Sequence, residues 1–174
     1  MVVDEAYIDF GGQTAASLIN QYENLLVVQT MSKSRSLAGM RVGYALGSQP
    51  LIEGLNRIKN SFNSYPLGHL QVAAAIAAFD DKAHFENSRQ KVITERERVT
   101  SQLEAMNFEV LPSTANFVLA RHNQKSAESL AALLRDRGII VRHFSKPRID
   151  QYLRVTIGTE NQNRLLIETL KNIL

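Results

Sequence analysis

The most informative part of this sequence is the run TMSKSRSLAGMRVG, from Thr30 to Gly43. It lies between two apolar segments, residues 25–28 and 42–46, which have the character of buried strands. Lys33 is therefore expected in a loop that leaves a strand, and a lysine in such a place can attack an aldehyde once it has lost its proton. Hydroxyl groups and an arginine suit a phosphate monoester, because they donate several hydrogen bonds to it. The run supplies both, from Thr30, Ser32, Ser34 and Arg41.

A second group of polar residues lies at the start of the chain. The short apolar segment of residues 1–3 leads directly into Asp4, and Tyr7 follows shortly after. Pyridoxal phosphate withdraws electrons from a bound amine only while its ring nitrogen stays protonated, and a carboxylate opposite that nitrogen keeps it so. A tyrosine hydroxyl can donate a hydrogen bond to the phenolic oxygen of the same ring. Together with Lys33, these residues predict a pyridoxal phosphate site.

These motifs, taken in order, resemble the fold-type I aminotransferases, and most closely the histidinol-phosphate aminotransferases. The motifs are Asp4-x-x-Tyr7, Thr30-x-Ser32-Lys33 and Leu37-Ala38-Gly39-x-Arg41-x-Gly43-Tyr44. The likeness continues through residues 60–66, 116–117 and 153–159, so it extends over almost the whole chain. The lysine loop and the Asp-x-x-Tyr pair are the specific part of it, whereas the other segments only favour the histidinol-phosphate branch.

The resemblance implies a role for each site residue. Lys33 would form the Schiff base with the cofactor, Asp4 would pair with the pyridinium nitrogen, and Tyr7 would contact the phenolic oxygen. The cofactor phosphate would be held by Thr30, Ser32 and Arg41. The substrate would be bound by Arg154 and Asn116 at its α-carboxylate and by Arg142 at a distal phosphate.

The implied function is pyridoxal-phosphate-dependent amino transfer, from histidinol phosphate to 2-oxoglutarate in histidine biosynthesis. A related aminotransferase or a threonine-phosphate decarboxylase is an alternative on the same scaffold. A non-catalytic fragment that associates with itself is another, because losing half a sheet exposes strand edges and apolar faces that must find partners. Taken singly, a lysine among serines is usually a solvated surface residue. Arginines in strand-like runs, such as Arg142 and Arg154, usually face solvent as well.

The resemblance also predicts that this chain is the C-terminal half of such an enzyme. Family members carry an earlier half that supplies part of the phosphate cradle, a residue stacked on the cofactor ring and most strands of the large domain. We therefore expect weak or absent cofactor binding and no useful turnover by the chain alone. Strand edges and apolar faces that have lost their neighbours need new ones, so a homodimer or larger assembly is expected.

Composition excludes several other classes of protein. The 174 residues are 44% hydrophobic, which is enough for a real core. A net charge of +3, from 20 basic and 17 acidic residues, gives no support for a nucleic-acid partner. The chain has no cysteine, its four histidines lack ligand-like spacing, and we expect no metal site. It shows no signal peptide and no long apolar span, so a cytoplasmic location without a membrane partner is expected.

The predicted fold class is α/β: a remnant of the three-layer large pyridoxal phosphate domain, then a long linking helix and a small α+β domain. The expected boundaries are 1–80, 81–107 and 108–174. In the first segment we expect a parallel sheet with strands at 1–3, 25–30 and 42–47. We also expect helical character at 14–22, a helix at 48–58, a loop at 60–66 and a buried, alanine-rich helix at 66–80.

The last segment is expected to form a four-stranded module with two helices on one side. Its predicted strands are residues 108–111, 116–121, 139–144 and 152–157. Ser126 should cap a helix that Gly138 ends, because serine accepts from free N–H groups and glycine adopts the left-handed conformation at low cost. Thr159 and Gln162 should form a capping box for the last helix.

Overall fold

The computed structural model describes all residues from Met1 to Leu174. It forms two compact units, residues 1–89 and 90–174. The predicted division at residues 80 and 107 stays a prediction. No helix in the structure is both long enough and apolar enough to cross a membrane.

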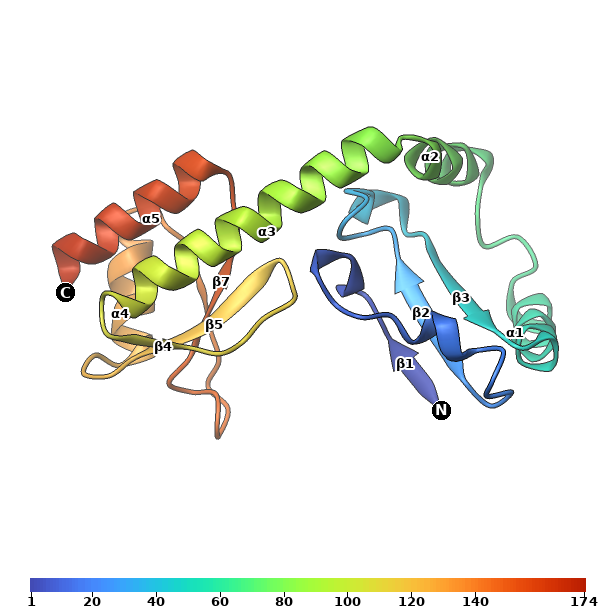
Figure 1. Ribbon diagram of the computed structural model, residues 1–174, viewed down its shortest axis with the longest axis horizontal. Helices are drawn as coiled ribbons and strands as arrows, with labels where there is room; N and C mark the ends of the chain where they lie inside the picture. Colours follow the sequence, from blue (N-terminus) through green and yellow to red (C-terminus); the bar gives the residue numbers. More distant parts are fainter. The chain divides into compact units, whose positions relative to one another are not determined.

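The first unit contains a three-stranded sheet in the order β1-β2-β3 (Figure 1). Its strands are β1 (Val2–Asp4), β2 (Leu26–Thr30) and β3 (Gly43–Gly47). β1 is parallel to β2, as expected, but β3 is antiparallel to β2, so the prediction of a wholly parallel sheet is wrong. A parallel partner needs a crossover that carries the chain back along the sheet, usually a helix. The loop after β2 contains only a short 3-10 turn, η3 (Ala38–Met40), and it returns the chain at the end where β2 stops.

The other elements of the first unit are short turns and two helices. The turns η1 (Ile8–Phe10) and η2 (Ala15–Leu18) lie between β1 and β2, so the helical character expected at 14–22 is confined to one turn of 3-10 helix. The helices are α1 (Gln49–Phe62) and α2 (His69–Asp80). α1 continues into the predicted loop at 60–66, because residues 55–65 contain no glycine or proline that would end it.

The expectation that the alanine-rich helix α2 is buried is wrong for this chain. None of its side chains is buried, and Leu70 and Ile76 are 79% and 58% exposed. α1 likewise buries no side chain, and Phe62 at its end is 94% exposed. The sequence of α2 is apolar, as predicted, but no side chain of α1 or α2 is buried by the rest of the chain.

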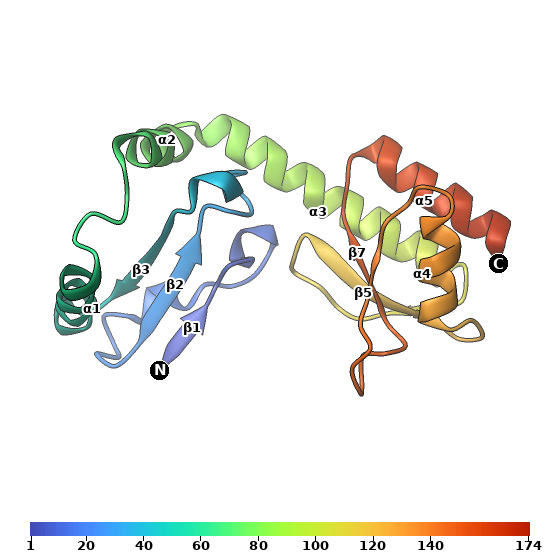
Figure 2. The ribbon, with the colours of Figure 1, turned by 180° about the vertical axis from the view of Figure 1, so that it is seen from behind.

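The second unit contains a four-stranded antiparallel sheet in the order β4-β5-β7-β6, and Figures 1 and 2 label β4, β5 and β7. Its strands are β4 (Phe108–Val110), β5 (Phe117–His122), β6 (Arg142–His143) and β7 (Leu153–Thr156). β6 is much shorter than the segment 139–144 that was expected. The helices are α3 (Lys82–Glu104), whose first turns belong to the first unit, α4 (Ala127–Arg135) and α5 (Glu160–Ile173).

One continuous hydrophobic core holds the second unit together. Val118 and Leu153, on neighbouring strands, are 1% and 2% exposed, as alternation along a sheet with one covered face requires. Each of the three helices adds buried side chains to this core, among them Leu103 of α3, Leu130 of α4 and Leu170 of α5. Three helices therefore contribute to the core, one more than the two expected.

The predicted helix ends in this unit are confirmed. Ser126 Oγ accepts from the Ser129 N–H at the start of α4, and Gly138 adopts a left-handed φ of 76° after its end. Thr159 and Gln162 form both hydrogen bonds of a capping box at the start of α5. These ends depend on neighbours in the sequence, which explains why the sequence predicts them well.

Candidate functional site

The predicted cofactor residues of the first unit meet at one edge of its sheet. Asp4 is the last residue of β1 and Thr30 is the last residue of β2, and these two strands are parallel. Gly43, which begins the antiparallel β3, pairs with Thr30, so Arg41 precedes β3 at the same edge. Ligands of open α/β sheets bind outside the carboxyl ends of the parallel strands. The sheet topology therefore brings these residues to the place where a ligand is expected.

Lys33 lies in the loop after β2 and its side chain is exposed. Its Nζ is 5.2 Å from the centre of the Tyr7 ring, which belongs to the turn after β1. An ammonium at this distance from an aromatic face is attracted to the ring. The structure thus brings together the lysine and the tyrosine that the sequence singled out.

Two hydroxyl groups lie beside Lys33. Thr30 Oγ1 donates to Ser32 Oγ over 3.0 Å and accepts from the Ser32 N–H over 3.1 Å. Arg41 is exposed, has a left-handed φ of 57°, and donates from Nη1 to the Ala38 carbonyl over 3.1 Å. The hydroxyls and the guanidinium are the kind of donors that bind a phosphate. Asp4 is also exposed, and its Oδ1 accepts from the Ala6 N–H over 2.9 Å.

Glu5, which no sequence motif singled out, anchors the segment between Asp4 and Tyr7. Glu5 is only 6% exposed, and its carboxylate accepts from Thr14 Oγ1, the Ala15 N–H and Gln29 Nε2 over 2.7, 2.6 and 2.8 Å. A buried carboxylate needs several such donors, because burial without them is costly. No spacing in the sequence distinguishes Glu5 from a solvated neighbour of Asp4.

The same network reaches β3 through Tyr44. Tyr44 donates from its hydroxyl to Gln29 Oε1 over 2.6 Å, which orients the amide so that its Nε2 faces Glu5. Burial raises the pKa of Tyr44 above its ordinary value, and the negative charges of Asp9 and Glu5 act in the same direction while Arg35 opposes them. Tyr44 therefore stays a hydrogen-bond donor at neutral pH, and the first unit has a polar network behind its candidate site.

The predicted substrate residues lie in the second unit. Arg142 of β6 and Arg154 of β7 are paired across the sheet, and both line a hollow of about 460 Å³ together with Arg135 of α4. The Nε of Arg154 is buried and has no hydrogen-bond partner. Its guanidinium lies 5.4 Å from the Phe117 ring and 5.8 Å from the Phe144 ring. A concentration of positive charge with an unsatisfied donor suits an anionic ligand.

Asn116, the remaining predicted substrate residue, directly precedes β5 and is half-buried. Its backbone carbonyl accepts from the Ile157 N–H over 2.9 Å, just beyond the end of β7. This bond fixes the backbone of Asn116 in the second unit.

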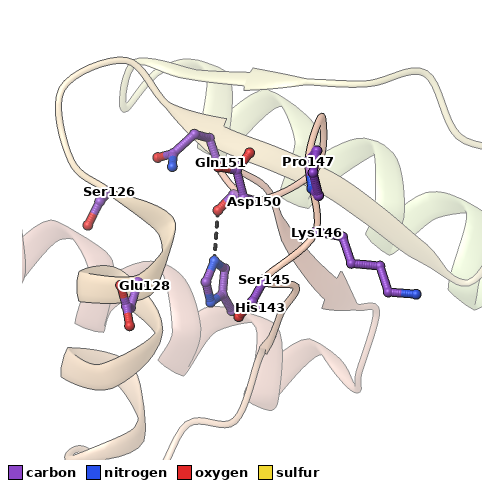
Figure 3. A pocket seen from close by; sticks show the side chains of 8 residues that line it. All are labelled: Ser126, Glu128, His143, Ser145, Lys146, Pro147, Asp150 and Gln151. Carbon is purple, nitrogen blue, oxygen red and sulfur yellow. Dashed lines mark hydrogen bonds between the residues drawn. The ribbon is translucent and has the colours of Figure 1, made fainter.

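A second hollow of the α+β unit, about 440 Å³, contains none of the predicted site residues (Figure 3). In it the His143 ring faces the segment around Asp150, and its Nε2 is 2.7 Å from the Asp150 carbonyl oxygen. Glu128 and Lys146 also line this hollow. In the whole chain, no group of three or more histidine, aspartate or glutamate side chains is arranged to hold a metal ion.

Comparison with known proteins identifies the family to which the chain belongs. The family model "Aminotransferase class I and II" matches residues 1–170. The chain is 62% identical over 170 residues to the histidinol-phosphate aminotransferase of Pseudomonas putida strain W619, covering 98% of this chain. It is 60% identical over 174 residues, all of this chain, to histidinol-phosphate aminotransferase 1 of Hydrogenovibrio crunogenus. It covers 49% of each of these relatives, so it spans about half their length.

The backbone of the chain is also similar to that of a solved histidinol-phosphate aminotransferase. The histidinol-phosphate aminotransferase of Clostridium acetobutylicum superposes with a TM-score of 0.89 at 28% identity, over 99% of this chain and 53% of that one. The likeness of the backbone therefore extends over both compact units. From the matched residues and the fold together, the chain belongs to the family of class I and II aminotransferases.

Proposed function

We propose that this chain is the C-terminal half of a pyridoxal-phosphate-dependent aminotransferase that transfers the amino group of histidinol phosphate to 2-oxoglutarate. The observation that carries the proposal is the position of Lys33, exposed at the edge of the sheet with its Nζ 5.2 Å from the Tyr7 ring. The names of the relatives at 60% and 62% identity support the substrate.

The residues of the first unit fit pyridoxal phosphate in the kind of groups they offer. Lys33 would be the covalent anchor, Tyr7 would contact the phenolic oxygen, and Asp4 would hold a proton on the ring nitrogen. The Thr30 and Ser32 hydroxyls, 3.0 Å apart, would turn from each other to the phosphate, with Arg41 as a third donor. When bound, the cofactor supplies an electron sink that makes the α-proton of the substrate acidic.

Lys33 would also move the proton that amino transfer requires. As a free amine, its Nζ would take the proton from the α-carbon of the substrate and give it back two atoms away, which is the 1,3-shift that amino transfer needs. The exposed side chain and the fixed loop around it allow Nζ to serve both positions. The Tyr7 ring would restrict the directions that the amine can reach.

The second unit would recognise the negative charges of the substrate. Arg154, with Asn116, would bind the α-carboxylate of 2-oxoglutarate, and Arg142 would bind the phosphate of histidinol phosphate. The unsatisfied Nε of Arg154 supports this role, because a buried donor without a partner costs free energy that an anionic ligand would recover. A planar guanidinium can bind both oxygens of such a group at once.

A chimera tests the proposed function and its substrate. The half of the Hydrogenovibrio relative that this chain does not match would be joined to this chain. Glutamate formation would be measured with histidinol phosphate and with an aromatic amino acid, and CO2 release would be measured with threonine phosphate. We expect turnover of histidinol phosphate by the chimera, none by its Lys33→Ala variant and none by the 174-residue chain alone. A folded chimera that turns over only one of the other substrates would contradict the substrate assignment.

A second candidate function is that of a non-catalytic chain that associates with itself. The exposed apolar side chains of α1 and α2 favour it, among them Phe62, which is 94% exposed, and Leu70. Patches of this kind on soluble proteins commonly mark interfaces. Light scattering at micromolar concentration should show a dimer or larger assembly, and a Phe62→Glu plus Leu70→Glu variant should shift it toward the monomer. A clean monomer in the unaltered chain would contradict this candidate.

A further inference from the structure

We infer that Arg35 is a positioning residue that fixes the loop carrying Lys33 by clamping it to α2 and to the first turn of α3. The inference rests on the proposed role of Lys33, because a covalent anchor must be presented at a defined place. Arg35 itself would touch neither cofactor nor substrate. It would act through the backbone of the loop.

The Arg35 side chain makes three contacts with residues of α2 and α3. Its guanidinium lies 3.6 Å from the centre of the Phe85 ring of α3 and 5.0 Å from that of Phe79 of α2. Its Nη1 donates to the Ala78 carbonyl over 2.6 Å. Arginine can stack on aromatic faces and donate in its own plane at the same time, which lysine cannot do.

The carbonyl that Arg35 binds belongs to a helix end. Ala78 lies in the last turn of α2, where the carbonyl groups have no partner within the helix. This end of the helix carries a partial negative charge, so a guanidinium there is favourable. Arg35 thus gives a hydrogen bond to a carbonyl at the end of α2 and, by the same contact, holds the loop that begins after β2.

The neighbours of Arg35 show that the loop needs such anchors. Ser34, which directly follows Lys33 and is 8% exposed, donates from Oγ to the carboxylate of Asp9 in η1. The loop is therefore also held on the side of the residue next to Lys33. Ser36 has a φ of 58°, a left-handed conformation that a residue other than glycine rarely adopts. Such a conformation persists only where the surrounding contacts impose it.

Amide hydrogen exchange tests the clamp without any cofactor. The Ser36 N–H donates to the Lys33 carbonyl over 3.1 Å and the Leu37 N–H to the Met31 carbonyl over 3.0 Å, so both report on the loop. We expect Arg35→Met to raise their exchange rates by about tenfold or more, with Arg35→Lys giving a similar rise. Arg57→Met, which alters an exposed arginine of α1, is the matched control and should change neither rate.

A second readout separates positioning from general loosening. The chain would be incubated with pyridoxal phosphate and reduced with borohydride, and the label at Lys33 measured by mass spectrometry. A parallel sample would be acetylated with acetic anhydride. In Arg35→Met the pyridoxal phosphate label at Lys33 should fall by about fivefold or more, whereas acetylation of this exposed amine should stay unchanged, because acetylation requires exposure but no defined position.

The outcomes are distinct. Faster exchange at Ser36 and Leu37 together with selective loss of the cofactor label supports the inference. Unchanged exchange, or equal loss of both labels, overturns it. If the unaltered chain takes no label at Lys33, as absent cofactor binding by this half alone would give, the exchange rates alone decide whether Arg35 clamps the loop, and the chimera decides the proposed function. Should Arg35→Met fail to fold, Phe85→Leu removes the stacked ring and must raise the same two exchange rates.

Discussion

The two compact units differ in where their apolar side chains lie. In residues 90–174, helix α5 buries five side chains, including Leu166, Ile167 and Leu170 at 5%, 3% and 2% exposure. In residues 1–89, helices α1 and α2 bury none, although α2 has the more apolar sequence. The second unit therefore contains its own core, while the first exposes surfaces that need a partner. Hydrophobic sequence shows that a surface should be covered, but it does not say by which part of which molecule.

The largest effect should come from truncating matched leucines in the two units. Leu130 of α4 is fully buried, so Leu130→Ala should lower the free energy of unfolding by about 2–5 kcal/mol. Leu70 of α2 is 79% exposed, so Leu70→Ala should change it by about 0.5 kcal/mol or less. Urea denaturation followed by circular dichroism measures both. Equal losses would show that α2 is covered in solution and would break the contrast between the units.

A polar network should give the next largest effect, again in the second unit. Glu95 of α3 accepts from Asn163 Nδ2 over 2.7 Å and from Arg98 Nη2 over 2.7 Å, and Asn163 is only 2% exposed. Glu95→Gln should cost about 1.5–3 kcal/mol, because it weakens bonds to a charged acceptor and leaves a buried amide poorly paired. Glu168→Gln, at an exposed pair 4.0 Å apart, is the control and should change little.

The same carboxylate makes the stability of the second unit depend on pH. The hydrogen bond from Arg98, with help from Asn163, lowers the pKa of Glu95 below its ordinary value of 4.5. A carboxyl group whose pKa is lower in the folded state stabilises the fold above the ordinary value, and that contribution disappears as the pH falls through the folded value. The stability difference between the unaltered chain and Glu95→Gln should therefore shrink on acidification. A difference that does not depend on pH would contradict the assignment.

The smallest effect concerns the capping box of α5. Thr159→Ala removes the hydroxyl that accepts from the Gln162 N–H, and it should cost about 1 kcal/mol. Thr159→Ser keeps the hydroxyl and should restore most of the loss. Urea denaturation of both variants provides the comparison, and an unchanged midpoint in Thr159→Ala would show that the cap adds nothing to the second unit.

The features that the sequence predicted best are local. The cap by Ser126, the left-handed Gly138 and the long helix α3 all depend on neighbouring residues, and all are present. The direction of β3 and the exposure of α2 depend on what lies beside them in space, and both expectations were wrong. Residue patterns contain the first kind of information and not the second.

The candidate site divides in the same way. The motif around Lys33 and the Asp4-x-x-Tyr7 pair predicted the edge of the sheet, because these residues follow strand ends in the chain. The residues behind them, Glu5 and Arg35, were missed. Their function depends on partners far along the chain, and their types are ordinary for a protein surface.

The most direct test of the account is a titration of the 174-residue chain with pyridoxal phosphate, followed by the visible absorption of the lysine-bound cofactor. If a full-length relative gains two further charge-assisted hydrogen bonds of about 1.5–3 kcal/mol each, this chain should bind roughly a hundred- to ten-thousandfold more weakly. The absorption should not saturate at the pyridoxal phosphate concentration that saturates the full-length relative. Lys33→Ala should abolish the absorption, while Lys59→Ala, at an exposed lysine of α1, should leave it unchanged. Saturation at the concentration that saturates the relative would contradict the proposal that this chain has only part of the cofactor site. Absorption that survives Lys33→Ala would contradict the assignment of Lys33 as the covalent anchor.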